Sequence, residues 1–220
     1  MHTLTLRAVT PVTHDVNHYL FERPEGYEFT PGQATDLAVD KEGWRDKTRP
    51  FTFISQPDEP SLEFCIKSYP DHDGVTEQLM MLSPGETVLI DEPWGAIEDK
   101  GPGVFIAGGA GITPFIPILR NRAREGKIDG CTLIFSNTSE ADIIMRDEWD
   151  AMEGLKTVYT VTGQPDSPLA IGMVDKDFLK NHVDDFGQNF YLCGPPEMVD
   201  EITEALKDLG ADPDGITFEE

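Results

Sequence analysis

A run of glycines near the middle of the chain has the residue types and the spacing to hold an anion. Residues 104–107 are apolar and long enough for a buried strand, and the glycines that follow, Gly109 and Gly111 among them, lead to Thr113-Pro114 and a second apolar run. Glycine permits positive φ and the close approach of a ligand, and free N–H groups at a helix start favour an anion. We predict a strand, a glycine turn and a helix, with Thr113 as the N-cap and Pro114 as the first helical residue.

A nucleotide phosphate and a purely structural turn are both compatible with these glycines, because Pro114 stands where the fingerprint G-x-G-x-x-G requires its third glycine. A similar turn at residues 193–196 (CGPP) follows the apolar residues 189–192, and residues 160–163 end another strand. In a parallel sheet the carboxyl ends of the strands lie at one edge, where ligands bind. Two glycine turns at that edge would form a cleft, which favours the nucleotide site.

The charge balance argues against two classes of partner. The chain has 17 basic and 41 acidic residues, which gives a formal net charge of -24. Such a surface repels nucleic acid and anionic lipid, so neither is expected as a partner. The acidic residues are spread along the chain, which indicates a solvated face; a saline habitat or a cationic protein partner would each explain the excess.

Cysteine spacing and the N-terminal residues limit the chemistry and the compartment. Cys65, Cys131 and Cys193 lie far apart, with no C-x-x-C motif and no nearby histidine cluster, so neither a disulfide framework nor a metal site is expected. The first residues lack the features of a signal peptide, and no window approaches about 20 apolar residues. We expect a soluble cytoplasmic protein without a membrane span.

The order of the predicted elements indicates two domains. Short β segments separated by Pro, Gly and Asp, with one helix at about 75–82, predict a small antiparallel β-barrel. The segments are residues 4–9, 16–21, 34–39, 49–54, 62–66 and 88–90. After residues 100–103, strands and helices alternate, which is typical of a doubly wound α/β parallel sheet. We place the boundary near residue 101, giving domains 1–100 and 101–220.

Six ordered motifs, which span nearly the whole chain, resemble those of the ferredoxin-NAD(P) reductase family. The motifs are residues 31–33 (PGQ), 49–55 (RPFTFIS, similar to R-x-Y-[ST]-x-x-S), 74–79 (GVTEQL), 92–95 (EPWG), 108–114 (GGAGITP) and 193–196 (CGPP). The resemblance implies an FAD-binding antiparallel β-barrel followed by an NAD(P)-binding α/β domain. It also implies an enzyme that takes hydride from a nicotinamide cofactor onto bound FAD.

The resemblance implies a flavin site in the first domain. Arg49 would fork two hydrogen bonds onto the flavin pyrophosphate. Phe51 would lie against the flavin ring, where the family usually has tyrosine, and Thr52, a candidate catalytic residue, could reach N5. Without the family, Arg49 would be a surface cation and Phe51 a core residue. The remaining residues expected at the flavin are Phe53, Lys67, Gly74, Val75 and Thr76.

In the second domain the resemblance implies a nicotinamide nucleotide site and gives a candidate catalytic residue, Cys193, beside the nicotinamide. Without the family, Cys193 would be a small buried residue at a strand end. The residues expected to bind this nucleotide are Gly109, Gly111, Thr113, Thr162, Cys193, Gly194 and Pro195. Thr162-Gly163 with nearby Asp166 offers no cation for a 2′-phosphate, so NADH is favoured over NADPH. Arg146 is expected to brace a loop.

Direct hydride transfer needs two stacked rings and the exclusion of water but no strong acid or base, which agrees with the scattered histidines. The expected acceptor is a redox protein in trans, a ferredoxin or flavodoxin, although these are generally acidic and a charge of -24 opposes the encounter. Salt, or a local basic patch, would offset the repulsion. The candidate patch is Arg120, Arg122, Arg124 and Lys127.

Two other functions stay open at the level of the sequence. Within the enzyme class, the acceptor would be a small molecule, namely free flavin, a ferric chelate or a quinone. In a different class, the chain would be a flavin-binding subunit that senses or relays redox state inside a complex.

Overall fold

The computed structural model describes residues 1–95 and 97–218, and the chain divides into two compact units after Gly95. This division falls slightly ahead of the boundary near residue 101, which stays a prediction. Each unit has its own sheet and its own buried core.

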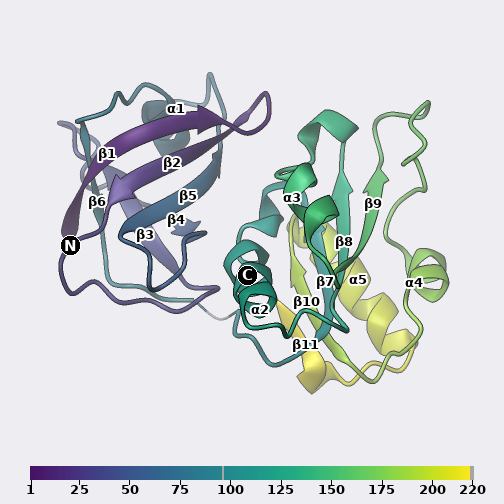
Figure 1. Cartoon of the computed structure of the whole chain (residues 1–220). Helices are drawn as coiled ribbons and strands as arrows, with labels where there is room; N and C mark the ends of the chain where they lie inside the picture. Colours follow the sequence, from purple (N-terminus) through teal and green to yellow (C-terminus); the bar gives the residue numbers. More distant parts are fainter. Residues whose placement is uncertain (96, 219–220) are drawn as a thin grey trace. The chain divides into compact units, whose positions relative to one another are not determined.

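The first unit is a near-closed antiparallel β-barrel, as predicted (Figure 1). Within residues 1–95 the strand order is β4-β3-β6-β1-β2-β5. Beyond the end of β4, the N–H of Ile54 donates to the carbonyl of Glu63 in β5 at 2.9 Å, which links the two outer strands. The elements are β1 (His2–Pro11), β2 (Val16–Glu22), β3 (Ala34–Val39), β4 (Arg49–Thr52), β5 (Ser61–Lys67), α1 (Val75–Met80) and β6 (Thr87–Ile90).

Alternating side chains fill the barrel. Leu4 and Leu6 of β1 and Tyr19 and Phe21 of β2 are fully buried, as the period of two in a half-buried strand requires. The fourth strand is shorter than the predicted 49–54. The backbone changes partners there: Phe53 N–H donates to Gln33 O, and the next residue bonds to β5, so the chain turns a barrel corner.

The second unit is a parallel sheet with helices on both faces, also as predicted. Within residues 97–218 the strand order is β11-β10-β7-β8-β9, and each pair is parallel. The strands are β7 (Gly103–Gly108), β8 (Thr132–Asn137), β9 (Lys156–Val161), β10 (Asn189–Cys193) and β11 (Ile216–Phe218). The helices are α2 (Phe115–Arg124), α3 (Arg146–Ala151), α4 (Lys176–His182) and α5 (Pro196–Asp208), with the 3-10 turns η1 (Gly109–Ile112), η2 (Glu140–Asp142) and η3 (Pro213–Gly215).

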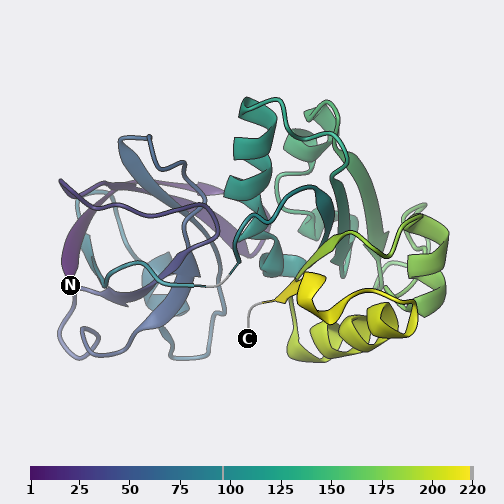
Figure 2. The same ribbon diagram turned by 90° about the horizontal axis from the view of Figure 1, so that it is seen from below.

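Successive side chains of the sheet point to opposite helical layers. Ile106 belongs to one buried cluster with Phe178 of α4 and Ile202 of α5. The neighbouring residue of β7, Phe105, points to the other face of the sheet, where the centroid of its ring lies 5.4 Å from that of Phe115 in α2. Figure 2 shows α2 and α3 on one face and α4 and α5 on the other. Among the described residues, no helix combines the length and apolarity needed to cross a membrane.

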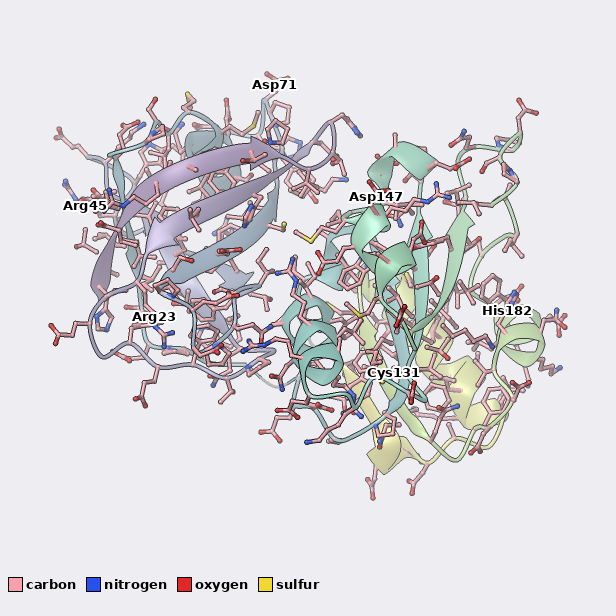
Figure 3. The ribbon with its side chains drawn as sticks, in the orientation of Figure 1. Arg23, Arg45, Asp71, Cys131, Asp147 and His182 are labelled. Atoms are coloured by element: carbon pink, nitrogen blue, oxygen red, sulfur yellow. The ribbon has the colours of Figure 1, made fainter. Side chains whose placement is uncertain are left out.

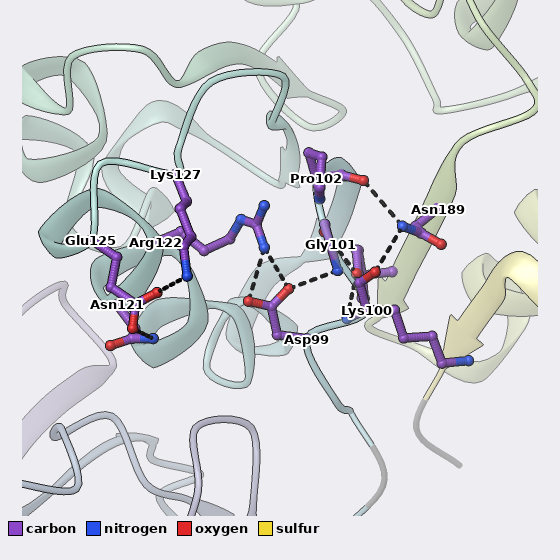
Figure 4. Close-up of polar contacts among 10 residues, drawn as sticks. Asp99, Lys100, Gly101, Pro102, Asn121, Arg122, Glu125, Lys127 and Asn189 are labelled. Atoms are coloured by element: carbon purple, nitrogen blue, oxygen red, sulfur yellow. Dashed lines mark hydrogen bonds and ion pairs between the residues drawn. The ribbon is translucent and has the colours of Figure 1, made fainter.

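The segment that enters the second unit is fixed to helix α2 and strand β10 by hydrogen bonds (Figure 4). The carboxylate of Asp99 accepts from Nη1 of Arg122 at 2.7 and 2.9 Å. The amide of Asn189 donates to the carbonyls of Lys100 and Pro102 at 3.3 and 3.2 Å. Because Arg122 is only 6% exposed, its guanidinium depends on this carboxylate.

The candidate basic patch is largely neutralised, which corrects the expectation that it could offset the anionic surface. Arg120 donates to both carboxylate oxygens of Glu148, at 2.6 and 2.8 Å. Lys127 pairs with Glu125 at 2.7 Å. Arg122 is paired as well, so Arg120, Arg122 and Lys127 each form an ion pair with a carboxylate in the folded protein. The sequence gives the cluster but not the long-range partners.

We expect Asp99→Ala to lower the free energy of unfolding by about 2 kcal/mol, since a hydrogen bond to a charged group contributes roughly 1.5–3 kcal/mol. Urea unfolding followed by far-UV circular dichroism measures the change. The matched control is Glu125→Ala, which removes an exposed ion pair with Lys127 and should change the free energy of unfolding much less. Equal losses in the two variants would contradict the structural role of Asp99.

Candidate functional site

The glycine turn after β7 is coiled more tightly than the sequence predicts. Gly109 has φ of 53°, a conformation that favours glycine. Residues 109–112 form η1, and Thr113 already has helical angles, so Pro114 takes the N-cap position of α2. The prediction of Thr113 as N-cap is therefore wrong: its hydroxyl donates to the carbonyl of Ala110 at 3.0 Å. The prediction required an extended backbone at Thr113 directly before the helix, whereas the 3-10 turn η1 brings the chain into helical angles before that residue.

The two predicted glycine turns come together at the carboxyl edge of the sheet. β7 and β10 are parallel neighbours, with Cys193 opposite Ala107. A Cβ on Gly111 would lie 2.3 Å from the carbonyl oxygen of Cys193, and one on Gly194 would lie 3.1 Å from the amide nitrogen of Gly108. The two backbones therefore pack directly on each other, and side chains at these glycines would separate them.

The glycines of the first turn have different surroundings. A Cβ built on Gly109 meets nothing within 4 Å, whereas one on Gly111 meets backbone. Gly109 is thus the position where a ligand could approach the chain, and Gly111 has a packing reason to lack a side chain. At the second turn Cys193 is partly exposed, and Pro195 precedes α5 as its N-cap.

A third segment at the same edge follows β9. The N–H of Thr162 donates to the carbonyl of Asn137 at 3.0 Å, and that of Gly163 to Thr138 at 2.8 Å, while the Thr162 side chain is exposed. Asn137 itself is 5% exposed, and neither polar atom of its side chain has a hydrogen-bond partner among the described residues. Sequence reasoning gave this buried amide no role, because its burial depends on the packing around the end of β8.

Glu140 connects this segment to the loop before α3. Its carboxylate accepts from the hydroxyl of Ser167 at 2.6 Å and from Arg146 at 2.9 Å. The Ser167 hydrogen bond and the Arg146 cation lower the pKa of Glu140, so it is ionised at neutral pH. Arg146 braces a loop, as predicted. Sequence reasoning missed Glu140, for which the only local signal is the capping box of Ser139 and Asp142 around it.

In the first unit, the structure brings Arg49 together with the turn that precedes α1. Both line a pocket of about 350 Å³. Arg49 is exposed, and one of its N–H groups donates to the carbonyl of Thr48. The side chain of Val75 is buried, so only its backbone is available to a ligand. The lining residues are Trp44, Asp46, Lys47, Thr48, Arg49, Asp73, Gly74 and Val75.

The other residues expected at the flavin lie in different surroundings. Phe51 is partly buried against the barrel core, and Thr52 is 9% exposed. Phe53 is fully buried, with its ring 4.5 Å from that of Phe29, so it could offer a ligand only its backbone. Lys67 pairs with Asp15 at 2.8 Å.

Comparison with known proteins identifies both units. Residues 3–98 match the oxidoreductase FAD-binding domain, and residues 105–204 match the oxidoreductase NAD-binding domain. NADH-cytochrome b5 reductase 1 of Aspergillus terreus is 32% identical over 231 residues, which cover 93% of this chain and 76% of the relative. The chain belongs to the ferredoxin-NAD(P) reductase family. It is an NAD(P)H-dependent flavoprotein reductase, with an FAD-binding and an NAD-binding domain.

Other members of the family give the same picture. The ferredoxin-NAD(P)(+) reductase component of the naphthalene 1,2-dioxygenase system of Pseudomonas putida is 28% identical, over 96% of this chain and 66% of the relative. The structure of a ferredoxin NADP+ reductase from Neisseria gonorrhoeae, solved with FAD and NADP, has a TM-score of 0.86 at 23% identity. It covers 99% of this chain and 97% of that one. The fold is therefore that of the family.

The residues of each unit fit the cofactor that the family implies. The pocket beside Arg49 has a second cation, Lys47, and an exposed guanidinium, as a pyrophosphate requires. In the second unit, Gly109 leaves open space beside the turn after β7, and the backbone of that turn packs at Gly111 against Cys193. Such a turn allows a phosphate to approach the chain closely.

We expect Gly111→Ala to lower the free energy of unfolding by about 3 kcal/mol, because the new Cβ forces the two turns apart and overpacking costs roughly 1–3 kcal/mol, occasionally more. Thermal unfolding compared with the wild-type protein measures the loss. The control is Gly210→Ala, where φ is 93° and a Cβ meets nothing within 4 Å. That variant should lose only about 1 kcal/mol, from the left-handed backbone. Similar losses in both variants would show that the contact with Cys193 does not restrict position 111.

Proposed function

We propose that this family member takes hydride from NADH onto bound FAD and passes the electrons to a separate redox protein. The observation that carries the proposal is the pairing of two sites in one chain: the Arg49 pocket of the FAD-binding unit and the joined glycine turns of the NAD-binding unit. When bound, FAD accepts hydride and can release electrons one at a time. The protein needs only to bind and orient the two cofactors and to exclude water.

In this proposal, side chains of the barrel place the flavin. Arg49 binds the pyrophosphate with two N–H groups, and Phe51 lies against the ring without the hydroxyl that tyrosine would bring. Thr52 faces the reactive edge of the ring. Backbone groups of Phe53, Gly74 and Val75, together with Thr76 and Lys67, complete the set.

The nicotinamide nucleotide takes the edge of the parallel sheet. Gly109 lets its phosphates approach the backbone, while Gly111 and Gly194 hold the two turns together. Thr113 and Pro195 border these turns. Cys193, partly exposed at the end of β10, lies beside the nicotinamide.

The choice of NADH rests on the charges near Thr162. Glu140 is ionised and accepts a hydrogen bond from Ser167, and the exposed Asp166 directly precedes Ser167 in the chain. The cation nearest in this network, Arg146, is already engaged by Glu140. A 2′-phosphate here would meet negative charge without a free cationic partner, whereas a ribose hydroxyl can donate to a carboxylate.

The proposed acceptor is a small redox protein of the ferredoxin or flavodoxin kind, in the cytoplasm. Relatives whose names include cytochrome b5 reductase and a dioxygenase ferredoxin reductase support a protein acceptor. The net charge of -24 and the pairing of Arg120, Arg122 and Lys127 with carboxylates oppose an acidic acceptor at low salt. They favour a neutral small acceptor, such as a quinone, as the second candidate.

Purified protein is expected to be yellow, and NADH added under anaerobic conditions should bleach its absorbance at about 450 nm. NADPH at the same concentration should bleach it more slowly, because of the carboxylates near Thr162. Stopped-flow absorbance measures both rates. A colourless protein that FAD does not reconstitute would contradict the flavin proposal, and a faster rate with NADPH would contradict the choice of nucleotide.

For an acidic ferredoxin, kcat/KM is expected to rise with salt, because the Debye length shortens from about 30 Å at 0.01 M to about 8 Å at 0.15 M and screens the repulsion. A neutral quinone is the control, and its kcat/KM should change little. A rate that falls with salt would instead reveal a basic docking surface. If the quinone has the higher kcat/KM at every salt concentration, the protein acceptor is the wrong assignment.

A further inference from the structure

Glu140 lies where the turn η2, the loop after β9 and helix α3 meet. It belongs to η2, which follows β8, and β8 pairs with β7, the strand that ends in the glycine turn. Its backbone N–H donates to the side-chain oxygen of Gln164 at 3.0 Å, and its carboxylate accepts from the hydroxyl of Ser167 at 2.6 Å. The loop after β9 therefore fixes both the backbone and the side chain of Glu140.

Arg146 is the cation of this network, and three contacts hold it. Its Nη1 donates to Oε2 of Glu140 at 2.9 Å, and its Nε lies 3.6 Å from a carboxylate oxygen of Asp150. Its guanidinium carbon lies 5.4 Å from the centroid of the Tyr159 ring. The side chains of Arg146 and Glu140 are 37% and 30% exposed, so a ligand at this edge of the sheet can reach both partners of the pair.

The carboxylate of Glu140 has hydrogen-bonding capacity left for a ligand. Among the described residues, Ser167 donates to Oε1 and Arg146 donates to Oε2, and each carboxylate oxygen has two lone pairs. A ribose hydroxyl can donate to such a group, whereas a phosphate brings only acceptor oxygens and negative charge. In dinucleotide-binding sheets, an acidic residue beyond the glycine turn takes the ribose 2′-hydroxyl and an arginine takes a 2′-phosphate. The chain supplies one residue of each type.

We propose that Glu140 accepts the ribose 2′-hydroxyl of NADH and, through its ion pair, withholds Arg146 from a 2′-phosphate, so that removing this one charge opens a latent NADPH site. The proposal rests on the proposed function, in which NADH binds at the edge of the parallel sheet. Thr162, which follows β9, is uncharged, so the choice between the two nucleotides falls to the carboxylate of Glu140.

The test compares NADH with NADPH in the FAD-loaded wild-type protein and in Glu140→Gln. Glutamine keeps an oxygen for Ser167 and for a ribose hydroxyl but lacks the charge that engages Arg146. For NADPH, kcat/KM should rise about tenfold, because the released guanidinium forms a charge-assisted hydrogen bond with the phosphate. For NADH, it should change less than about threefold. Anaerobic reduction of the flavin, followed by stopped-flow absorbance, gives the corresponding rates.

A second variant, Glu140→Ala, tests the hydrogen bond to the ribose. It should show the same gain with NADPH but lose about fivefold in kcat/KM with NADH, since alanine offers no acceptor to the hydroxyl. The recovery of NADH use in Glu140→Gln separates this role from a merely structural one.

Binding without hydride transfer is measured by titration calorimetry of the FAD-loaded protein. The ligands are 2′,5′-ADP, which carries the 2′-phosphate, and 5′-ADP, which lacks it. Glu140→Gln should bind 2′,5′-ADP about tenfold more tightly than the wild-type protein does, while its affinity for 5′-ADP stays within about threefold.

Two further variants identify the source of the gain. Adding Arg146→Ala to Glu140→Gln should return kcat/KM for NADPH to the wild-type value, because the cation that binds the phosphate is gone. The matched control is Asp147→Asn, at an exposed position of the same helix that is labelled in Figure 3. It also removes one negative charge, and it should change kcat/KM for either nucleotide by less than about twofold.

The outcomes separate this proposal from the proposed function. An unchanged preference in Glu140→Gln, a gain that survives Arg146→Ala, or an equal gain in Asp147→Asn would overturn the role of Glu140 while the choice of NADH stands. A wild-type protein that is reduced faster by NADPH, or whose flavin neither nucleotide reduces, would overturn both. Flavin reduction by NADH also reports whether each variant is folded.

Discussion

The close packing of two backbone turns is the constraint on which the nucleotide-binding unit depends. Gly111 lies so near the carbonyl of Cys193 that a single methyl group would not fit. That contact joins the ends of β7 and β10, so the helices that follow both strands begin from one fixed edge. Gly109 can then leave open space for a ligand, because its neighbours supply the rigidity. Gly111 thus serves the packing of the two turns, and Gly109 leaves room for the ligand.

Charge is organised differently in the interior and on the surface. The chain is strongly anionic, yet its cations near α2 are matched with carboxylates, and the buried Arg122 pairs with the more exposed Asp99. Exposed pairs of this kind contribute little to stability, but they remove positive charge from the surface. The excess negative charge therefore faces solvent, where it affects the rate at which the protein meets an electron acceptor and the charge of the acceptor that it favours.

Much of the fold could be predicted from local patterns. The limits of β3 coincide with those expected, because turn residues mark both ends of this apolar segment. β4 ends early because Phe53 bonds to Gln33, which precedes β3, and Ile54 bonds to Glu63 in β5, so neither continues the ladder with β3. Glu140 and Ser167, 27 positions apart, likewise meet only in the folded sheet. Local rules locate the elements, but contacts of this range depend on the tertiary structure.

The ammonium of Lys47, which lies 4.1 Å from the centroid of the Trp44 indole, has a consequence for the protein before it holds a cofactor. A bare aromatic face beside an open pocket is an adhesive surface for other chains. With Lys47 over it, that face carries a hydrated charge instead. This side of the pocket beside Arg49 therefore presents a positive charge to other proteins rather than a bare apolar ring, which disfavours aggregation through that ring.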